Sequence, residues 1–248
     1  MGRNTEIYTF NKEKAKQNLL PFISDQVLTN RSFIQFLNKR EREYGSVLGT
    51  SADQLAHVIS ENINFIRPDN FLQLMFFLNN EIIYPTPVPE KNIDDYGIML
   101  LYELPTTTVC TGYMFQYGNY THHYPVEDLG GSDCGVNISA EDFSGFNAYM
   151  ILLTRKILDS RIDSNAYTVN DFTEPERKIY EKIRLKFSEN EKFQNIVQEE
   201  FLHLKKSFIN DNSGQDAQTI YYASTFFSTS IMMHQKITQQ NRVVILDY

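Results

Sequence analysis

Tryptophan is absent from this sequence, and cysteine occurs only twice, as Cys110 and Cys134. Two cysteines spaced this far apart form neither a disulfide framework nor the paired pattern of a zinc site. The longest apolar runs, 71–78 and 98–102, fall far short of the roughly 20 residues that cross a bilayer. The first residues are polar and lack the apolar stretch of a secretory signal. We therefore expect a cytoplasmic protein that does not act at a membrane.

Positive charge is also scarce. The chain has 23 Lys and Arg residues against 31 Asp and Glu residues, a formal net charge of -8 at pH 7. Its short basic runs, 39–42 and 205–206, lie beside glutamates and are typical of solvated helix faces. Binding to nucleic acid requires clustered Lys and Arg, so we expect no nucleic-acid partner. An acidic protein is better suited to a basic protein partner.

Sequence motifs for common cofactors are missing as well. The one glycine-rich loop, 130–135, lacks both the dinucleotide-binding pattern and the Lys-Ser/Thr pair of a phosphate-binding loop. We therefore expect no cofactor. With 42% hydrophobic and 22% charged residues, the chain has the composition of an ordinary globular protein.

A central segment, 94–143, is organised differently from the rest of the chain. It has strand composition and contains both cysteines and an adjacent histidine pair, whereas the flanking segments are mostly helical in periodicity. Strands are predicted at 6–10, 98–104, 109–117, 120–126 and 242–248. Helices are predicted from Asn11, over 30–44, and from Ser51, Pro68, Ser139, Thr173, Ser188 and Gln215. The pattern favours an α+β fold, helix-rich, with a small and mostly antiparallel sheet formed by the central hairpin and the terminal strands.

The length of 248 residues suits one large domain covering 1–248. Three prolines, Pro85, Pro87 and Pro89, alternate with other residues and favour an extended connector. The connector at 85–90 is the best candidate for a subdomain boundary, and it can equally be an ordered strap across a single domain.

A catalytic hypothesis rests on Cys134 in the glycine-rich loop. His122 or His123 would serve as the base and Asp133 or Asp128 would orient it, which would activate the thiol as a nucleophile. The surrounding residues do not match the signatures of known cysteine hydrolases. A loop of this composition is more often a plain turn, so this hypothesis remains the alternative.

Metal binding is weighed at two places. Adjacent strand residues such as His122 and His123 point to opposite faces, so they cannot share one ion without a bend. Glu200 and His203 form a Glu-x-x-His pair, the element of dimetal helical bundles. That site needs a second such pair, which the sequence does not supply around His57 or His234. We therefore expect no metal site.

Tyrosines and acids mingle in the central segment. Tyrosine is frequent among interface hot spots, and nearby carboxylates steer a basic partner toward the surface. The commoner fate of such tyrosines is to be half-buried sheet residues with solvated hydroxyls. The residues predicted to bind a partner are Tyr113, Tyr117, Tyr120, Tyr124, Glu127, Asp128 and Asp133.

The first hypothesis for function is a protein that binds a partner surface and performs no chemistry. In its acidic, tyrosine-rich composition the chain is similar to bacterial immunity proteins, and that resemblance implies neutralisation of a cognate toxin by stoichiometric occlusion. The alternatives are a hydrolase or transferase that uses Cys134, and a structural oligomer subunit that uses the uncharged face of 219–233. The sequence leaves the oligomeric state open.

Overall fold

The computed structural model describes residues 5–19, 21, 66–78, 93–104, 117–118, 120–124, 126, 135–161, 173–209, 215–237 and 242–247. The chain divides into two compact units. We call residues 1–110, 126–140 and 239–248 the sheet unit, and residues 111–125 and 141–238 the helical unit. The single-domain interpretation stays a prediction, and the connector at 85–90 lies outside the described residues.

The sheet unit contains a four-stranded sheet with the order β2-β1-β4-β3. Its strands are β1 (Thr5–Phe10), β2 (Ile98–Leu104), β3 (Gly135–Ser139) and β4 (Arg242–Asp247). Each neighbouring pair is antiparallel, with β1 and β4 in the centre. The predicted α+β class and the two terminal strands are confirmed. The final strand pairs with the first, as its apolar composition requires.

The central segment enters the sheet differently from the prediction. A strand at 120–126 is wrong, because residues 120–123 are helical and the Tyr124 amide donates to the Tyr120 carbonyl at 2.8 Å. Of the strand predicted at 109–117, only Tyr117 is described, and it is helical. Another strand of this region, β3, begins at the end of the glycine-rich loop 130–135 and was not predicted. β2 and β3 lie at opposite edges of the sheet, so these two strands do not pair with each other.

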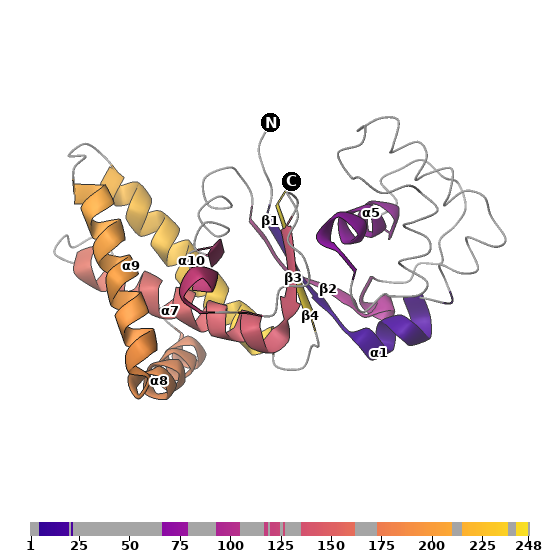
Figure 1. The fold of residues 1–248 in the computed structure, drawn as a ribbon, viewed down its shortest axis with the longest axis horizontal. Helices are drawn as coiled ribbons and strands as arrows, with labels where there is room; N and C mark the ends of the chain where they lie inside the picture. Colours follow the sequence, from indigo (N-terminus) through magenta and orange to yellow (C-terminus); the bar gives the residue numbers. More distant parts are fainter. Residues whose placement is uncertain are drawn as a thin grey trace. The chain divides into compact units, whose positions relative to one another are not determined.

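Helix α5 (Pro68–Leu78) packs on one face of the sheet, as the ribbon shows (Figure 1). The ring of Phe71 contacts Tyr8 and Phe10, at centroid distances of 5.4 and 6.3 Å. Tyr8 and Phe10 alternate along β1 and so project from the same face. The helix predicted from Pro68 is confirmed, and proline in its first turn fits a position whose amide needs no helical partner.

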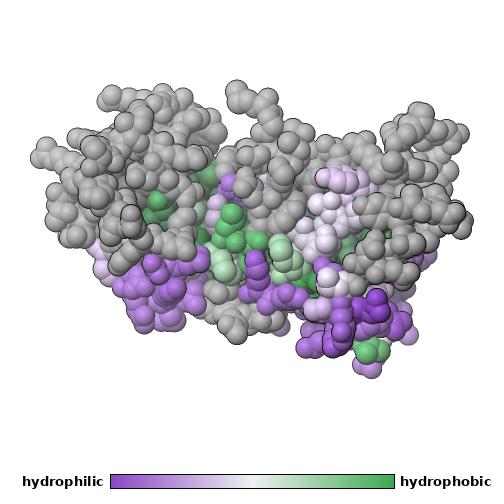
Figure 2. All heavy atoms as spheres, turned by 180° about the vertical axis from the view of Figure 1, so that it is seen from behind, coloured by the Kyte–Doolittle hydropathy of each residue, from purple (hydrophilic) through white to green (hydrophobic). Residues whose placement is uncertain are grey.

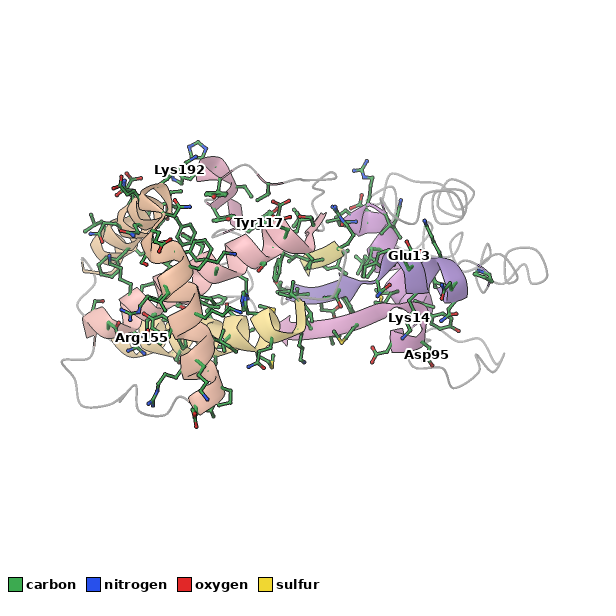
Figure 3. All side chains as sticks on the ribbon, turned by 90° about the horizontal axis from the view of Figure 1, so that it is seen from below. Glu13, Lys14, Asp95, Tyr117, Arg155 and Lys192 are labelled. Carbon is green, nitrogen blue, oxygen red and sulfur yellow. The ribbon has the colours of Figure 1, made fainter. Side chains whose placement is uncertain are left out.

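A second helical segment follows β1 and is hydrogen-bonded to the residues just before β2. Helix α1 (Lys12–Lys14) continues into the π-helix η1 (Ala15–Leu19). As predicted, Asn11 caps the start, its side-chain oxygen accepting from the Lys14 amide at 3.0 Å. The Lys14 ammonium and the Asn18 amide donate to the carbonyls of Asp94 and Asp95, in the short 3-10 helix η4 (Ile93–Tyr96). Figure 3 labels Lys14 and Asp95, one residue from each of these two hydrogen bonds.

Polar side chains are buried where β3 meets β4. Asn137 is 1% exposed and Arg242 is 8% exposed. The Arg242 guanidinium donates to the side-chain oxygen and to the carbonyl of Asn137, each at 3.1 Å. The Asn137 amide in turn donates to the Ile66 carbonyl at 2.7 Å, just before α5. This network ties the edge strand to the segment that carries the packing helix.

The described part of the helical unit contains four long helices: α7 (Ala140–Arg161), α8 (Glu174–Ser188), α9 (Glu191–Ile209) and α10 (Gln215–Ile237). The capping box predicted at the start of α8 is confirmed, since the Glu176 carboxylate accepts from the Thr173 amide at 2.9 Å. The predicted cap of α9 is wrong: Ser188 ends α8, and the Asn190 side chain accepts from the Phe193 amide at 3.0 Å.

One core of the helical unit lies between α7, α8 and α10. Its fully buried members are Ala148, Ile151, Leu158, Ile183, Ala223, Phe227 and Ile231. The uncharged face predicted on α10 therefore contributes to this core, with Phe227 and Ile231 each 1% exposed, while Tyr221 on the same helix is 59% exposed. Among the described helices, none has the length and apolar character of a membrane span.

Candidate protein-binding surface

The predicted site residues divide into two groups. Five of them lie outside the described residues: Tyr113, Glu127, Asp128, Asp133 and Cys134. The partner-binding role of the first four, and the thiol chemistry of Cys134, stay predictions. The other five lie on one short helical turn of the helical unit: Tyr117, Tyr120, His122, His123 and Tyr124.

Tyr117 and Tyr120 are held inside an aromatic cluster on α7. Tyr117 is 5% exposed and meets Phe146 edge-on at 5.1 Å. Tyr120 is 2% exposed and contacts Phe146 at 5.5 Å and Tyr149 at 5.3 Å. Burial, and then the nearby Tyr124 and Asp142, raise the pKa of the Tyr120 phenol above its usual range. Tyr120 is therefore a neutral, packed anchor for the turn at physiological pH.

The close approach of Tyr120 to α7 depends on a glycine. A Cβ atom on Gly145 would lie 2.8 Å from the Tyr120 hydroxyl oxygen. Because the Tyr120 ring is enclosed by other aromatic rings, it cannot easily swing away. The absence of a side chain at Gly145 thus makes room for the phenol that fixes the turn.

Tyr124 is the member of the cluster that reaches solvent. Its ring stacks on Tyr120 with a centroid distance of 5.5 Å and an interplanar angle of 15°. The Lys192 ammonium of α9 lies 5.5 Å from the ring centroid of Tyr124. Tyr124 is half-buried, so part of its ring remains open to a partner. In Figure 3, the label Tyr117 marks the helical turn that carries Tyr124, and the label Lys192 marks the start of α9.

The two histidines complete this surface. His122 is exposed and His123 is half-buried, and their rings meet edge-on at 5.1 Å. His123 Nε2 lies 3.8 Å from a carboxylate oxygen of Glu200, which is largely buried on α9. Sequence reasoning linked Glu200 to His203, its neighbour along the helix, and missed the contact with His123. We call Tyr124, His122, His123 and Lys192 the Tyr124 surface.

The metal and catalytic hypotheses are tested by the structure to different extents. Among the described residues, His, Cys, Asp and Glu side chains do not gather in groups of three or more that could hold a metal ion. The described part of the proposed catalytic set consists of His122 and His123 alone. Its chemical partners, Cys134 and Asp133, fall outside the described residues.

A groove of about 640 Å³ lies between α7, α8 and α9 in the same unit. Its volume falls within the range of ligand-binding clefts. The apolar residues that line it are Leu152, Tyr180, Phe187, Phe193 and Val197. The polar and charged residues that line it are Arg155, Lys156, Asp159, Arg184, Ser188, Gln194, Asn195 and Gln198.

Three cations and one carboxylate border this groove, a local charge opposite to that of the whole protein. Arg155, labelled in Figure 3, pairs with Asp159 at 2.9 Å and lies 5.5 Å from the centroid of the Tyr180 ring. Arg184 pairs with Glu181 on its own helix at 2.7 Å. Lys156 instead donates to the neutral side-chain oxygen of Gln198 and lies over the Phe201 ring.

Sequence reasoning did not find the groove, although part of its pattern is visible. Arg155 and Asp159 are one helical turn apart on α7, and Phe187 and Gln194 flank the junction of α8 and α9. Each residue alone is typical of an ordinary amphipathic helix. Only the packing of three helices places them around one space.

Comparison of the chain with protein families, with curated proteins and with solved structures finds no match.

Proposed function

We propose that the protein acts by binding a partner protein through the Tyr124 surface, without carrying out a chemical reaction. The observation that supports this proposal most is the pairing of a half-exposed Tyr124 ring with a fully packed Tyr120 ring beneath it. An aromatic side chain that is already held in place loses little conformational freedom on binding. Such preorganised tyrosines are frequent among interface hot spots.

The form of binding that we propose is that of an immunity-type inhibitor in the cytoplasm. It would neutralise a cognate toxin by covering its working surface in an equimolar complex. The partner would be basic, because the chain carries a formal net charge of -8 and its predicted binding acids Glu127, Asp128 and Asp133 follow Tyr124 closely in sequence. Tyr124 would supply contact area, and these acids would supply attraction and speed of association.

The proposal is tested by placing a photo-crosslinking phenylalanine analogue at position 124 in the cells that make the protein. The matched control carries the same analogue at Leu185, which is 63% exposed on α8 and distant in sequence from the turn. Proteins joined at position 124 and not at position 185 are identified by mass spectrometry and purified. Their affinities for wild type, Tyr124→Ala and Leu185→Ala are then measured by calorimetry.

We expect one partner to be captured at position 124 alone, and Tyr124→Ala to weaken its binding by at least about 2 kcal/mol. Leu185→Ala should bind as wild type does. A toxic partner should lose its activity in an equimolar mixture with the wild-type protein. Equal capture at both positions, no capture, or equal affinities of the two alanine variants would contradict the proposal.

A further inference from the structure

We propose that the groove between α7, α8 and α9 is a second binding site, and that it takes an acidic peptide segment bearing an aromatic or aliphatic side chain. This inference does not depend on the Tyr124 surface. It concerns a site of opposite local charge, and a partner of opposite chemistry, within the same helical unit.

The apolar floor of the groove is built from three helices. Leu152 comes from α7, Phe187 from α8 and Phe193 from α9, and the last two rings stack with a centroid distance of 4.3 Å. Phe193 is 1% exposed, so it forms a firm base rather than a movable flap. A side chain of the size of leucine or phenylalanine would bury apolar area here in exchange for water.

The charged side chains that border the groove favour a negatively charged ligand. Asp159 and Glu181 already pair with Arg155 and Arg184, and these pairs hold the two guanidinium groups in position. Lys156 is different, because its contacts are with a neutral amide and the face of an aromatic ring. Its ammonium charge has no carboxylate within the described part of the chain. A ligand carboxylate is the group that would complement it.

The polar side chains along α9 favour a peptide over a fatty acid. Gln194, Asn195 and Gln198 follow one edge of the groove. The Gln194 nitrogen already donates to the Ser188 carbonyl and the Gln198 oxygen accepts from Lys156, so the Gln194 oxygen can accept from a peptide amide and the Gln198 nitrogen can donate to a peptide carbonyl. A lipid chain is usually enclosed on most of its surface and needs few such partners. Figure 2 shows hydrophilic residues gathered at the lower right, where α8 lies.

The experiment uses the full-length protein and a short fluorescein-labelled peptide in which glutamate alternates with phenylalanine. A second peptide has glutamine in place of every glutamate. Binding is measured by fluorescence anisotropy for wild type, Lys156→Glu and the control Lys182→Glu. Lys182 is exposed on α8 and does not line the groove. Lys182→Glu changes the net charge of the protein by the same amount as Lys156→Glu.

We expect the acidic peptide to bind wild type and Lys182→Glu alike, and Lys156→Glu to weaken its binding by about tenfold or more. The glutamine peptide should bind all three proteins weakly. Circular dichroism establishes that each variant keeps the helical content of wild type.

Several outcomes would overturn the inference. Equal weakening by Lys156→Glu and Lys182→Glu would mean long-range charge attraction without a site. Equal binding of the two peptides, or no binding of the acidic one, would show that the cations of the groove do not recognise ligand carboxylates. A decanoate that displaces the peptide and binds more tightly would assign the groove to fatty acids. A wild-type dimer that Lys156→Glu dissociates would assign it to a second copy of this chain.

Discussion

Both units of this protein combine aromatic packing with buried hydrogen bonds, as the Phe71–Tyr8 contact and the Asn147–Ser230 bond show, but their most extensive described contacts differ. In the sheet unit, directional hydrogen bonds reach into the core, where Arg242, Asn137 and the Ile66 carbonyl form a buried network. In the helical unit, the rings of Tyr120 and Phe146 pack against each other, and Gly145 leaves room for the Tyr120 hydroxyl. Side-chain packing can readjust, whereas a strand ladder has few alternatives. Both candidate binding features, the Tyr124 surface and the groove, belong to the unit that is held by packing.

The largest effect is expected from Gly135→Ala in β3. Gly135 has φ of +144°, a backbone conformation that residues with a Cβ atom rarely adopt, and an added Cβ would overlap the carbonyl oxygen of Ile245 in β4. The obstacle is backbone, so neither strand can yield without losing ladder bonds. We expect a loss of about 3 kcal/mol in the free energy of unfolding, measured by urea denaturation.

The control for that substitution is Gly118→Ala on the helical turn, where an added Cβ meets no atom within 4 Å. Its effect should stay within about 0.5 kcal/mol. Similar losses in the free energy of unfolding for both variants would mean that replacing glycine acts through the entropy of the unfolded chain. They would contradict the close fit of β3 against β4 at Gly135.

A second, somewhat smaller effect is expected from Asn137→Ala. The substitution removes the side-chain acceptor of Arg242 Nε and the donor to the Ile66 carbonyl, while the bond from Arg242 to the Asn137 backbone carbonyl remains. We expect a loss of about 2–3 kcal/mol by urea denaturation. The exposed Asn195→Ala on α9 is the control and should change little.

The double variant Asn137→Ala with Arg242→Met tests whether the network acts as one unit. Because it removes both partners of the bond, its loss should be smaller than the sum of the two single losses. Strictly additive losses would show that the two side chains stabilise the sheet unit independently.

In the helical unit, Gly145→Ala should have a smaller effect that can be rescued. The new Cβ would lie 2.8 Å from the Tyr120 hydroxyl oxygen, whereas the ring carbon that bears it is 3.9 Å away. The crowding costs about 1–3 kcal/mol, and the helix propensity of alanine offsets about 1 kcal/mol of it. In a Tyr120→Phe background the crowding disappears, so Gly145→Ala should become stabilising. An unchanged sign in that background would contradict the packing described here.

The smallest effect on the free energy of unfolding is expected from lowering the pH. It should arise in the helical unit, which contains every described histidine. Burial, and then the nearby Lys182 and Lys186, lower the pKa of His234 below its usual 6.5. Above pH 6.5 His234 is neutral in the folded and unfolded chains. As the pH falls further, the unfolded chain takes up the proton first, so the free energy of unfolding decreases until the folded-state pKa is passed.

Denaturation from about pH 7.5 to about pH 5 should therefore show a decline that His234→Gln reduces. Hydrogen exchange resolved by region should place the loss of protection in α7–α10 more than in β1 and β4. A decline of equal size in wild type and His234→Gln would exclude His234 as its cause.

The predictions that succeeded, in both units, are those that depend on local patterns. Terminal strands and helix starts depend on local patterns, such as the apolar residues of β4 and the Thr173–Glu176 capping box. The segment 120–124 has the composition of a strand and is helical, because the Tyr120 ring packs into the aromatic cluster of α7. Tertiary packing there outweighs the weak β preference of tyrosine. Composition singled out Tyr124, but it did not predict the stacking of Tyr124 on Tyr120 or the position of Lys192 beside it.

By itself, the sequence determined an α+β protein with a mostly antiparallel sheet that contains its two end strands, because apolar periodicity and helix caps act over a few neighbouring residues. Only the tertiary structure decided that β2 and β3 lie at opposite edges, that His123 meets Glu200, and that three helices enclose a basic groove in an acidic protein. Contacts between residues far apart in the chain depend on how whole elements pack, and local patterns do not encode that packing.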